Sequence, residues 1–238
     1  MKVNKYPSIV RVESLRKAFR HPRLLLYFLR GYREEGLARE HVGMHLHQTT
    51  RMGFEGSEDP IELFHKAVDL CQNPCYSTTY LYWICRRLKP RKVVETGVHF
   101  GVSSAFILEA LEGTGGRLYS IDLPNVARGG WDILPPNSQP GCVVPERLRH
   151  NWTLILGDVR KKLVPLLQAL GQIDVFHHDS THTYELMTFE FEAAWPFIIP
   201  GGLLLSHDVD RSDAFKDLCY RHSVRNATYK RIGIAVKN

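Results

Sequence analysis

One stretch constrains the fold more than any other. Residues 93–105 read VVETGVHFGVSSA, where two β-branched residues precede an acidic, glycine-bearing turn and an apolar segment of helical periodicity follows. This pattern predicts a strand, a tight loop and a helix. Gly97 can adopt backbone angles that are closed to other residues, and Gly101 allows the helix start to approach the strand closely. The stretch therefore predicts a ligand-binding loop of the nucleotide-binding type.

The charge of this loop indicates which ligand it binds. A dinucleotide site places pyrophosphate on the helix N-terminus and usually reads G-x-G-x-x-G, whereas Glu95 stands here at the position of the first glycine. A carboxylate repels pyrophosphate but suits a cationic ligand, such as the ammonium and sulfonium groups of S-adenosylmethionine. The sequence pattern Glu95-x-Gly97-x-x-x-Gly101 resembles the first motif of class I S-adenosylmethionine-dependent methyltransferases. The resemblance implies that Glu95, Gly97 and Gly101 hold the methionine end of that cofactor.

Strand and helix patterns alternate from Lys92 onward, which is typical of a parallel sheet covered by helices on both faces. The last two strand patterns, residues 227–230 and 232–236, suit a closing antiparallel hairpin. We therefore expect an α/β fold with a Rossmann-like, seven-stranded, mostly parallel sheet and a C-terminal antiparallel hairpin. The earlier strands are expected at residues 92–95, 117–122 and 152–158, with two more beginning at Ile173 and Leu203.

Two aspartates follow predicted strands near the loop. Asp122 ends the second strand, where an acid can accept hydrogen bonds from ribose hydroxyls; its alternative role is to cap a turn. Asp158 precedes the helix predicted at residues 159–170 and is expected to be its N-cap. In the family that the chain resembles, an acid in such a Gly-Asp pair lies beside adenine. The resemblance therefore implies a second role for Asp158, as acceptor from the adenine amine.

Polar residues also follow the fourth and fifth predicted strands. The fourth strand leads into HHDSTHTY, residues 177–184, and the fifth leads into His207 and Asp208. The carboxyl ends of parallel strands meet at one edge of a sheet, and open α/β sheets bind ligands there. Asp179 and Asp208 should therefore converge beside the cofactor loop.

The phrase His178-Asp179-Ser180-x-His182-x-Tyr184, together with the later pair His207-Asp208, resembles the family that includes macrolide-sugar O-methyltransferases. More distantly it is similar to catechol O-methyltransferase, and the resemblance covers residues 92–236. It implies a divalent cation such as Mg²⁺, held by Asp179 and Asp208, that aligns an acceptor hydroxyl and lowers its pKa. His182 stands where the catechol enzyme has a lysine base, so His182 is assigned as the catalytic base.

His207 departs from the catechol enzyme, whose corresponding pair is an acid followed by an amide. One interpretation makes His207 a third metal ligand, and because magnesium disfavours imidazole, such a role would favour manganese, iron or zinc. The other interpretation is that the histidines around these strand ends only satisfy backbone groups.

The first part of the chain carries most of the positive charge. Residues 1–60 are expected to form a basic helical arm and linker, and residues 61–238 a methyltransferase domain with leading helices. Residues 1–33 hold nine Lys or Arg and one Glu, whereas the whole chain has a net charge of +6. The rest is thus slightly acidic, and no nucleic-acid partner is expected.

Within the arm, residues 14–20 and 23–33 read as two short amphipathic helices divided by His21-Pro22. These helices could pack within the protein or in a homo-oligomer. They could also contact a membrane surface or an anionic polymer.

Residues 123–145 are too long and too rich in Gly and Pro for an ordinary crossover, and they include Trp131. Long loops at this edge of a sheet are commonly lids or substrate walls. We therefore assign this loop to contact with the acceptor.

Targeting signals are not evident in the sequence. No apolar run is long enough to span a bilayer, and no leader with a cleavage site follows Met1. The five cysteines form no regular framework and fit reduced thiols. We expect a cytoplasmic protein.

These features together predict an S-adenosylmethionine-dependent O-methyltransferase that acts on a hydroxyl of a small molecule, sugar or glycoconjugate, with help from a divalent cation. Two alternatives stay open: an NAD-dependent oxidoreductase on a similar sheet, against which Glu95 argues, and a methyltransferase-like binding protein without turnover. A nucleic-acid methyltransferase is disfavoured, since the sequence lacks the Asn-Pro-Pro-aromatic signature of amino methylation on bases.

Overall fold

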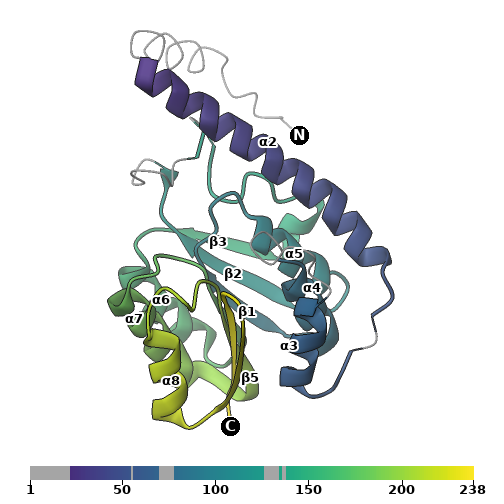
Figure 1. Cartoon of the computed structure of the whole chain (residues 1–238), viewed down its shortest axis with the longest axis vertical. Coiled ribbons are helices and arrows are strands. Elements are labelled where there is room, and N and C mark those ends of the chain that lie inside the picture. The colour runs from purple at the N-terminus through teal and green to yellow at the C-terminus, as the bar shows by residue number, and fades with distance from the viewer. Residues whose placement is uncertain (1–21, 55, 70–77, 126–133, 136–137) are drawn as a thin grey trace.

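The computed structural model describes residues 22–54, 56–69, 78–125, 134–135 and 138–238, with the backbone alone for residues 22–32. Its strands are β1 (Lys92–Thr96), β2 (Arg117–Asp122), β3 (Trp152–Leu156), β4 (Ile173–His178), β5 (Ile198–Ser206), β6 (Arg225–Tyr229) and β7 (Ile232–Val236). They form one sheet in the order β3-β2-β1-β4-β5-β7-β6 (Figure 1). All pairs are parallel except those of β7, which runs antiparallel to β5 and β6. The predicted fold class is confirmed.

Helices cover both faces of the sheet. They are α2 (Pro22–Arg51), α3 (Pro60–Asp69), α4 (Thr79–Leu88), α5 (Val102–Leu111), α6 (Val159–Leu170), α7 (Tyr184–Ala194) and α8 (Ala214–His222), with short 3-10 helices η2 (Glu146–Asn151) and η3 (Trp195–Phe197). Side chains of α3, α4 and α5 share one apolar core with Val93, and those of α6, α7 and α8 share the other with Val94. Successive strand residues point to opposite faces, so neighbouring valines of β1 serve the two layers.

Helix α2 corrects the prediction for the arm. The helix expected at residues 23–33 does not end there but continues to Arg51, across Gly36 and Gly43. The reason is tertiary: Val42, Leu46 and Thr49 are buried, and their burial outweighs a glycine cost of about 1 kcal/mol each. Figure 1 shows α2 as a long rod lying across the α4 and α5 side of the domain. The helix predicted at residues 14–20 lies outside the described residues.

Several other element boundaries differ from the prediction: β1 ends at Thr96 rather than residue 95, β3 ends at Leu156 rather than residue 158, and β6 spans Arg225–Tyr229 rather than residues 227–230. Strand β5 begins at Ile198 rather than Leu203, because the Pro-Gly-Gly segment is accommodated within the strand by a register shift opposite β4. Helix α7 ends at Ala194, and η3 follows it directly. Within the described part of the chain, no helix combines the length and apolar character needed to cross a membrane.

The loops that follow β1 and β4, residues 97–101 and 179–183, are in backbone contact. The Asp179 N–H donates to the Thr96 carbonyl at 2.8 Å. Gly97 adopts φ +82°, and a Cβ added there would lie 2.1 Å from the Asp179 carbonyl oxygen. Only glycine lets the two loops approach this closely. We call residues 97–101 the β1 loop and residues 179–183 the β4 exit loop.

Substitution of Gly97 by alanine should therefore be severe. We expect Gly97→Ala to lower the free energy of unfolding by about 3 kcal/mol or more, since the left-handed angle and the clash both oppose a methyl group. Gly115→Ala is the matched control, because Gly115 has φ +80° and no atom within 4 Å of an added Cβ. It should cost only about 1–2 kcal/mol. Urea denaturation measures both, and equal losses would contradict the contact.

Candidate active site at the carboxyl edge of the sheet

A cavity of about 580 Å³ opens where β1, β2, β3 and β4 end. This size lies within the range of roughly 300–1,000 Å³ that is typical of small-molecule sites. The walls come from the loops after these four strands and from α7: Gly97, Val98, His99, Ile121, Asp122, Leu123, Gly157, Asp158, Val159, Arg160, Asp179, Ser180, Thr181, His182 and Leu186. Of the residues predicted to bind cofactor, the cavity is lined by Gly97, Asp122 and Asp158.

Glu95 lies beneath the cavity rather than in its wall. Its side chain is fully buried, and its carboxylate accepts hydrogen bonds from the hydroxyls of Ser103, Ser104 and Ser120 at 2.6, 2.6 and 2.7 Å. The Nδ1 atom of buried His177 lies 3.6 Å from it. These contacts tie β1 to α5 and β2, so Glu95 fixes the base of the β1 loop. Direct contact of Glu95 with a cofactor stays a prediction.

Gly101 packs against the long loop, residues 123–145, rather than against the cavity. It adopts φ +93°, and an added Cβ would lie 2.6 Å from the Cα atom of Gly141. The Gly141 N–H donates to the His99 carbonyl at 2.8 Å. The end of the long loop thus supports the β1 loop from outside. Trp131, the aromatic residue assigned to acceptor contact, lies outside the described residues.

Asp122 and Asp158 hold backbone groups at the cavity wall. Asp122 Oδ2 accepts the N–H groups of Val98 and His99 at 2.9 and 2.7 Å, so this carboxylate shapes the β1 loop. Asp158 Oδ1 accepts the Arg160 N–H at 2.9 Å, which confirms that Asp158 is the N-cap of α6. Carboxylate oxygens have several acceptor positions. Contacts of the two aspartates with ribose and adenine stay predictions.

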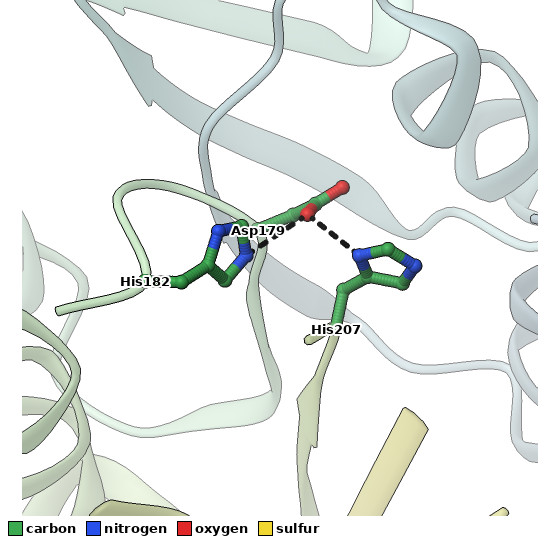
Figure 2. Close-up of side chains that lie close together, drawn as sticks. All are labelled: Asp179, His182 and His207. Carbon is green, nitrogen blue, oxygen red and sulfur yellow. Dashed lines mark ion pairs between the residues drawn. The ribbon is translucent and has the colours of Figure 1, made fainter. Parts of the chain in front are cut away.

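Three side chains converge beside the cavity. Figure 2 shows the imidazoles of His182 and His207 close to the carboxylate of Asp179. His207 Nδ1 lies 3.3 Å and His182 Nε2 lies 3.5 Å from Asp179 Oδ1. One ligand-type atom from each residue lies within 4.8 Å of those of the other two. We call this group the Asp-His-His cluster.

Asp208, predicted to share a metal with Asp179, is not part of this cluster. It has a left-handed backbone, with φ +52°, and its carboxylate is ion-paired with Arg231 at 2.5 Å. Its oxygens nevertheless lie 3.2 Å from His207 Nδ1 and 3.7 Å from His182 Nδ1. Asp208 is thus placed to orient both imidazoles, and its role as a ligand stays a prediction. Sequence reasoning missed Arg231, which lies in the β6–β7 turn and belongs to no motif.

Electrostatics in the cluster favour an ionised carboxylate next to a charged imidazole. Burial alone would raise the pKa of Asp179, but hydrogen bonding to His182 and His207 outweighs burial and holds this pKa well below its ordinary value. Burial would likewise lower the pKa of His207, but Asp179 and Asp208 outweigh it and raise this pKa. The carboxylates therefore favour a positive charge at His207, and a metal ion bound there could supply that charge in place of the proton.

The donor set fits a divalent metal ion. One carboxylate and two imidazoles converge, and His182 Nε2 is buried without a hydrogen bond of regular geometry in the described structure. Imidazole ligands suit manganese, iron and zinc better than magnesium. The cluster therefore matches a transition-metal site more closely than a magnesium site.

The sheet order, with β7 antiparallel at its end and a cavity at the carboxyl edge, defines a Rossmann-like fold of the class I methyltransferase type. A family model described as "Methyltransferase domain" matches residues 94–209. Residues 94–209 thus carry a methyltransferase domain, as the sequence motifs predicted.

Solved structures with the same fold are distant in sequence. The O-methyltransferase TomG from Streptomyces achromogenes, in complex with SAM, has TM-score 0.52 and 15% identity over 81% of this chain and 95% of that one. The SAH-bound methyltransferase PaMTH1 from Podospora anserina has TM-score 0.51 and 11% identity, over 84% and 96%. MycE from the mycinamycin biosynthetic pathway, in complex with Mg and SAH, has TM-score 0.50 and 17% identity, over 78% and 56%. A comparison with curated protein sequences gives no match.

The raised pKa of His207 predicts how stability depends on pH. The stabilisation from charged His207 is fully present below its unfolded pKa and is lost as pH rises through the higher folded pKa. Without divalent cations, His207→Gln should therefore lower the free energy of unfolding more at about pH 5.5 than at about pH 8.5. Urea denaturation in EDTA measures this difference. In an Asp179→Asn background it should shrink, and a loss independent of pH would contradict the charge pairing.

Proposed function

We propose that this protein transfers a methyl group from S-adenosylmethionine to a hydroxyl of a small molecule, sugar or glycoconjugate, with assistance from a divalent cation. One observation carries the proposal: the cavity that holds Gly97, Asp122 and Asp158 also reaches Asp179 and His182 of the Asp-His-His cluster. Candidate groups for holding the methyl donor and for activating an acceptor thus share one cavity.

The donor would bind along the first three loops. The β1 loop would face the methionine end, Asp122 the ribose, and Asp158 the adenine side of the cavity. SAM or SAH is present in the TomG, PaMTH1 and MycE structures named above, which supports this choice of cofactor. Glu95 would support this site indirectly. Its three hydrogen bonds from serine hydroxyls would keep the β1 loop in its binding conformation before the donor binds.

The acceptor would be activated at the other end of the cavity. Methyl transfer from a sulfonium is an in-line displacement, so the protein must align the acceptor oxygen and remove its proton. Asp179 and His207 would hold the divalent ion, which when bound lowers the pKa of an acceptor hydroxyl. His182 would accept the proton through its buried Nε2 atom, and Asp208 near His182 Nδ1 would stabilise the resulting imidazolium.

The nature of the cluster supports a particular kind of ion. Magnesium prefers oxygen ligands, whereas one of the two proposed ligands, His207, is an imidazole. We therefore favour Mn²⁺, Fe²⁺ or Zn²⁺ as the ion that assists this chain. The magnesium in the MycE structure is a property of that protein.

Cofactor binding is the first test of this function. Titration calorimetry should detect binding of S-adenosylhomocysteine and none of NAD, and Asp122→Asn should weaken the affinity by about tenfold, as expected for losing a charged hydrogen bond. Asp213→Asn is the control, because the Asp213 side chain is 77% exposed and far from the cavity wall. Binding of NAD without S-adenosylhomocysteine would favour an oxidoreductase. Binding of S-adenosylhomocysteine without methyl transfer to any hydroxylated acceptor would favour an idle binding protein.

The metal assignment has its own test. Asp179→Asn should weaken Mn²⁺ binding by about 100-fold or more, since it removes the charged ligand of the cluster. Asp210→Asn should leave Mn²⁺ affinity unchanged, because Asp210 is half exposed and pairs with Arg231 at 3.5 Å. His182→Gln should keep Mn²⁺ affinity within about tenfold but lose methyl transfer, as expected for a base. Loss of Mn²⁺ affinity in His182→Gln, measured by calorimetry, would make His182 a ligand instead.

A further inference from the structure

A buried carboxylate on α7 has no role in the chemistry described so far. Glu190 is fully buried, although the other buried residues of α7 are apolar. A buried carboxylate is costly unless several donors satisfy it. Its three hydrogen-bond donors come from two other segments, the end of β1 and the end of β4 with its exit loop, so they indicate what this acid holds together.

Two of the three donors to Glu190 lie at the ends of central strands, and the third lies in the loop after β4. The Thr96 hydroxyl, at the end of β1, donates to Oε2 in a short hydrogen bond. His178 Nδ1, at the end of β4, lies 2.8 Å from the same oxygen. The Ser180 hydroxyl, in the β4 exit loop, donates to Oε1 at 2.5 Å. One carboxylate therefore binds β1, β4 and the loop that leaves β4.

These donors surround the place where the two functional loops touch. Thr96 precedes Gly97 of the β1 loop, and its carbonyl accepts the Asp179 N–H at 2.8 Å. His178 and Ser180 are the two neighbours of Asp179 in the chain. Fixing their side chains fixes the backbone that carries the Asp179 carboxylate.

The ring of His178 extends the same support to the cluster. It lies against the His182 ring, with centroids 5.4 Å apart and planes at 85°. Because His178 is fully buried and bonded to Glu190, it forms a rigid wall for His182. Glu190 thus influences two of the three members of the Asp-His-His cluster without touching any of them.

We propose that Glu190 is a positioning residue that sets the Asp-His-His cluster against the β1 loop. The inference rests on the proposed function, because it assigns the cluster to metal and the β1 loop to the methyl donor. In-line transfer is sensitive to placement, and a shift of about 1 Å can cost about 100-fold in rate. Residues that orient metal ligands typically contribute about 10–100-fold to metal affinity. Glu190 would act in both ways through Thr96, His178 and Ser180.

Glu190→Gln tests this role with little change in size. An amide offers one acceptor oxygen and turns an N–H group toward donors, so at least one of the three hydrogen bonds must break. The Kd for Mn²⁺ should rise by about tenfold or more, while the Kd for S-adenosylhomocysteine should change by less than about threefold. Glu190→Asp keeps the charge and should recover part of the Mn²⁺ affinity.

Glu192→Gln is the matched control on the same helix. Glu192 is half exposed and pairs with Arg221 at 2.8 Å, away from the cavity. This variant should bind Mn²⁺ and S-adenosylhomocysteine like the wild-type protein. If Glu190→Gln is folded by circular dichroism and keeps wild-type Mn²⁺ affinity, Glu190 is only a structural residue and the inference is overturned.

Amide hydrogen exchange separates this inference from the proposed function. If the wild-type protein binds neither Mn²⁺ nor S-adenosylhomocysteine, the proposed function fails. Exchange of the Asp179 amide, which is bonded to Thr96, still reports on positioning. Exchange at least about tenfold faster in Glu190→Gln than in Glu192→Gln supports the inference, and equal exchange overturns it.

Discussion

The backbone contact between Gly97 and Asp179 is the constraint on which the site depends. A parallel sheet brings the ends of β1 and β4 together, but side chains would normally keep their loops apart. Here the missing Cβ of Gly97 lets the Asp179 carbonyl take that space, and the Thr96 carbonyl accepts the Asp179 N–H. The β1 loop and the Asp-His-His cluster therefore keep a fixed separation. A reaction that transfers a group between two bound molecules benefits from such a fixed separation.

The acidic side chains in and beneath the site have three kinds of partner: neutral hydrogen-bond donors, an arginine and imidazoles. Glu95 is held by three serine hydroxyls and Glu190 by two hydroxyls and an imidazole, and among the described residues neither has a lysine or arginine partner. Asp208, nearer the cavity, is paired with Arg231. Asp179 faces imidazoles, which can give up a proton to make room for another cation. The place where a metal ion could replace a proton is thus the place where we propose that the reaction occurs.

Much of the framework could be predicted from local patterns, whereas contacts between distant segments could not. Periodicity and capping gave the bounds of β2 and α6 and the N-cap role of Asp158, because these depend on neighbouring residues. Strand order implied that Asp179 and Asp208 would converge, and His207 Nδ1 lies within 3.3 Å of a carboxylate oxygen of each. The full length of α2 depends on burial against other helices, and nothing in the local sequence reports it.

Side-chain direction was harder to predict than position. Contact of Glu95 with a cofactor stays a prediction, and the sequence did not indicate that hydroxyls of α5 and β2 would donate to its carboxylate. Asp208 follows β5 as expected and its carboxylate lies 3.2 Å from His207 Nδ1, but no local pattern indicated its pairing with Arg231. The Asp122 carboxylate already accepts hydrogen bonds from two backbone N–H groups of the β1 loop. The pocket is thus preorganised, so binding of the proposed cofactor would order little further backbone, which favours one-step association over a slow induced fit.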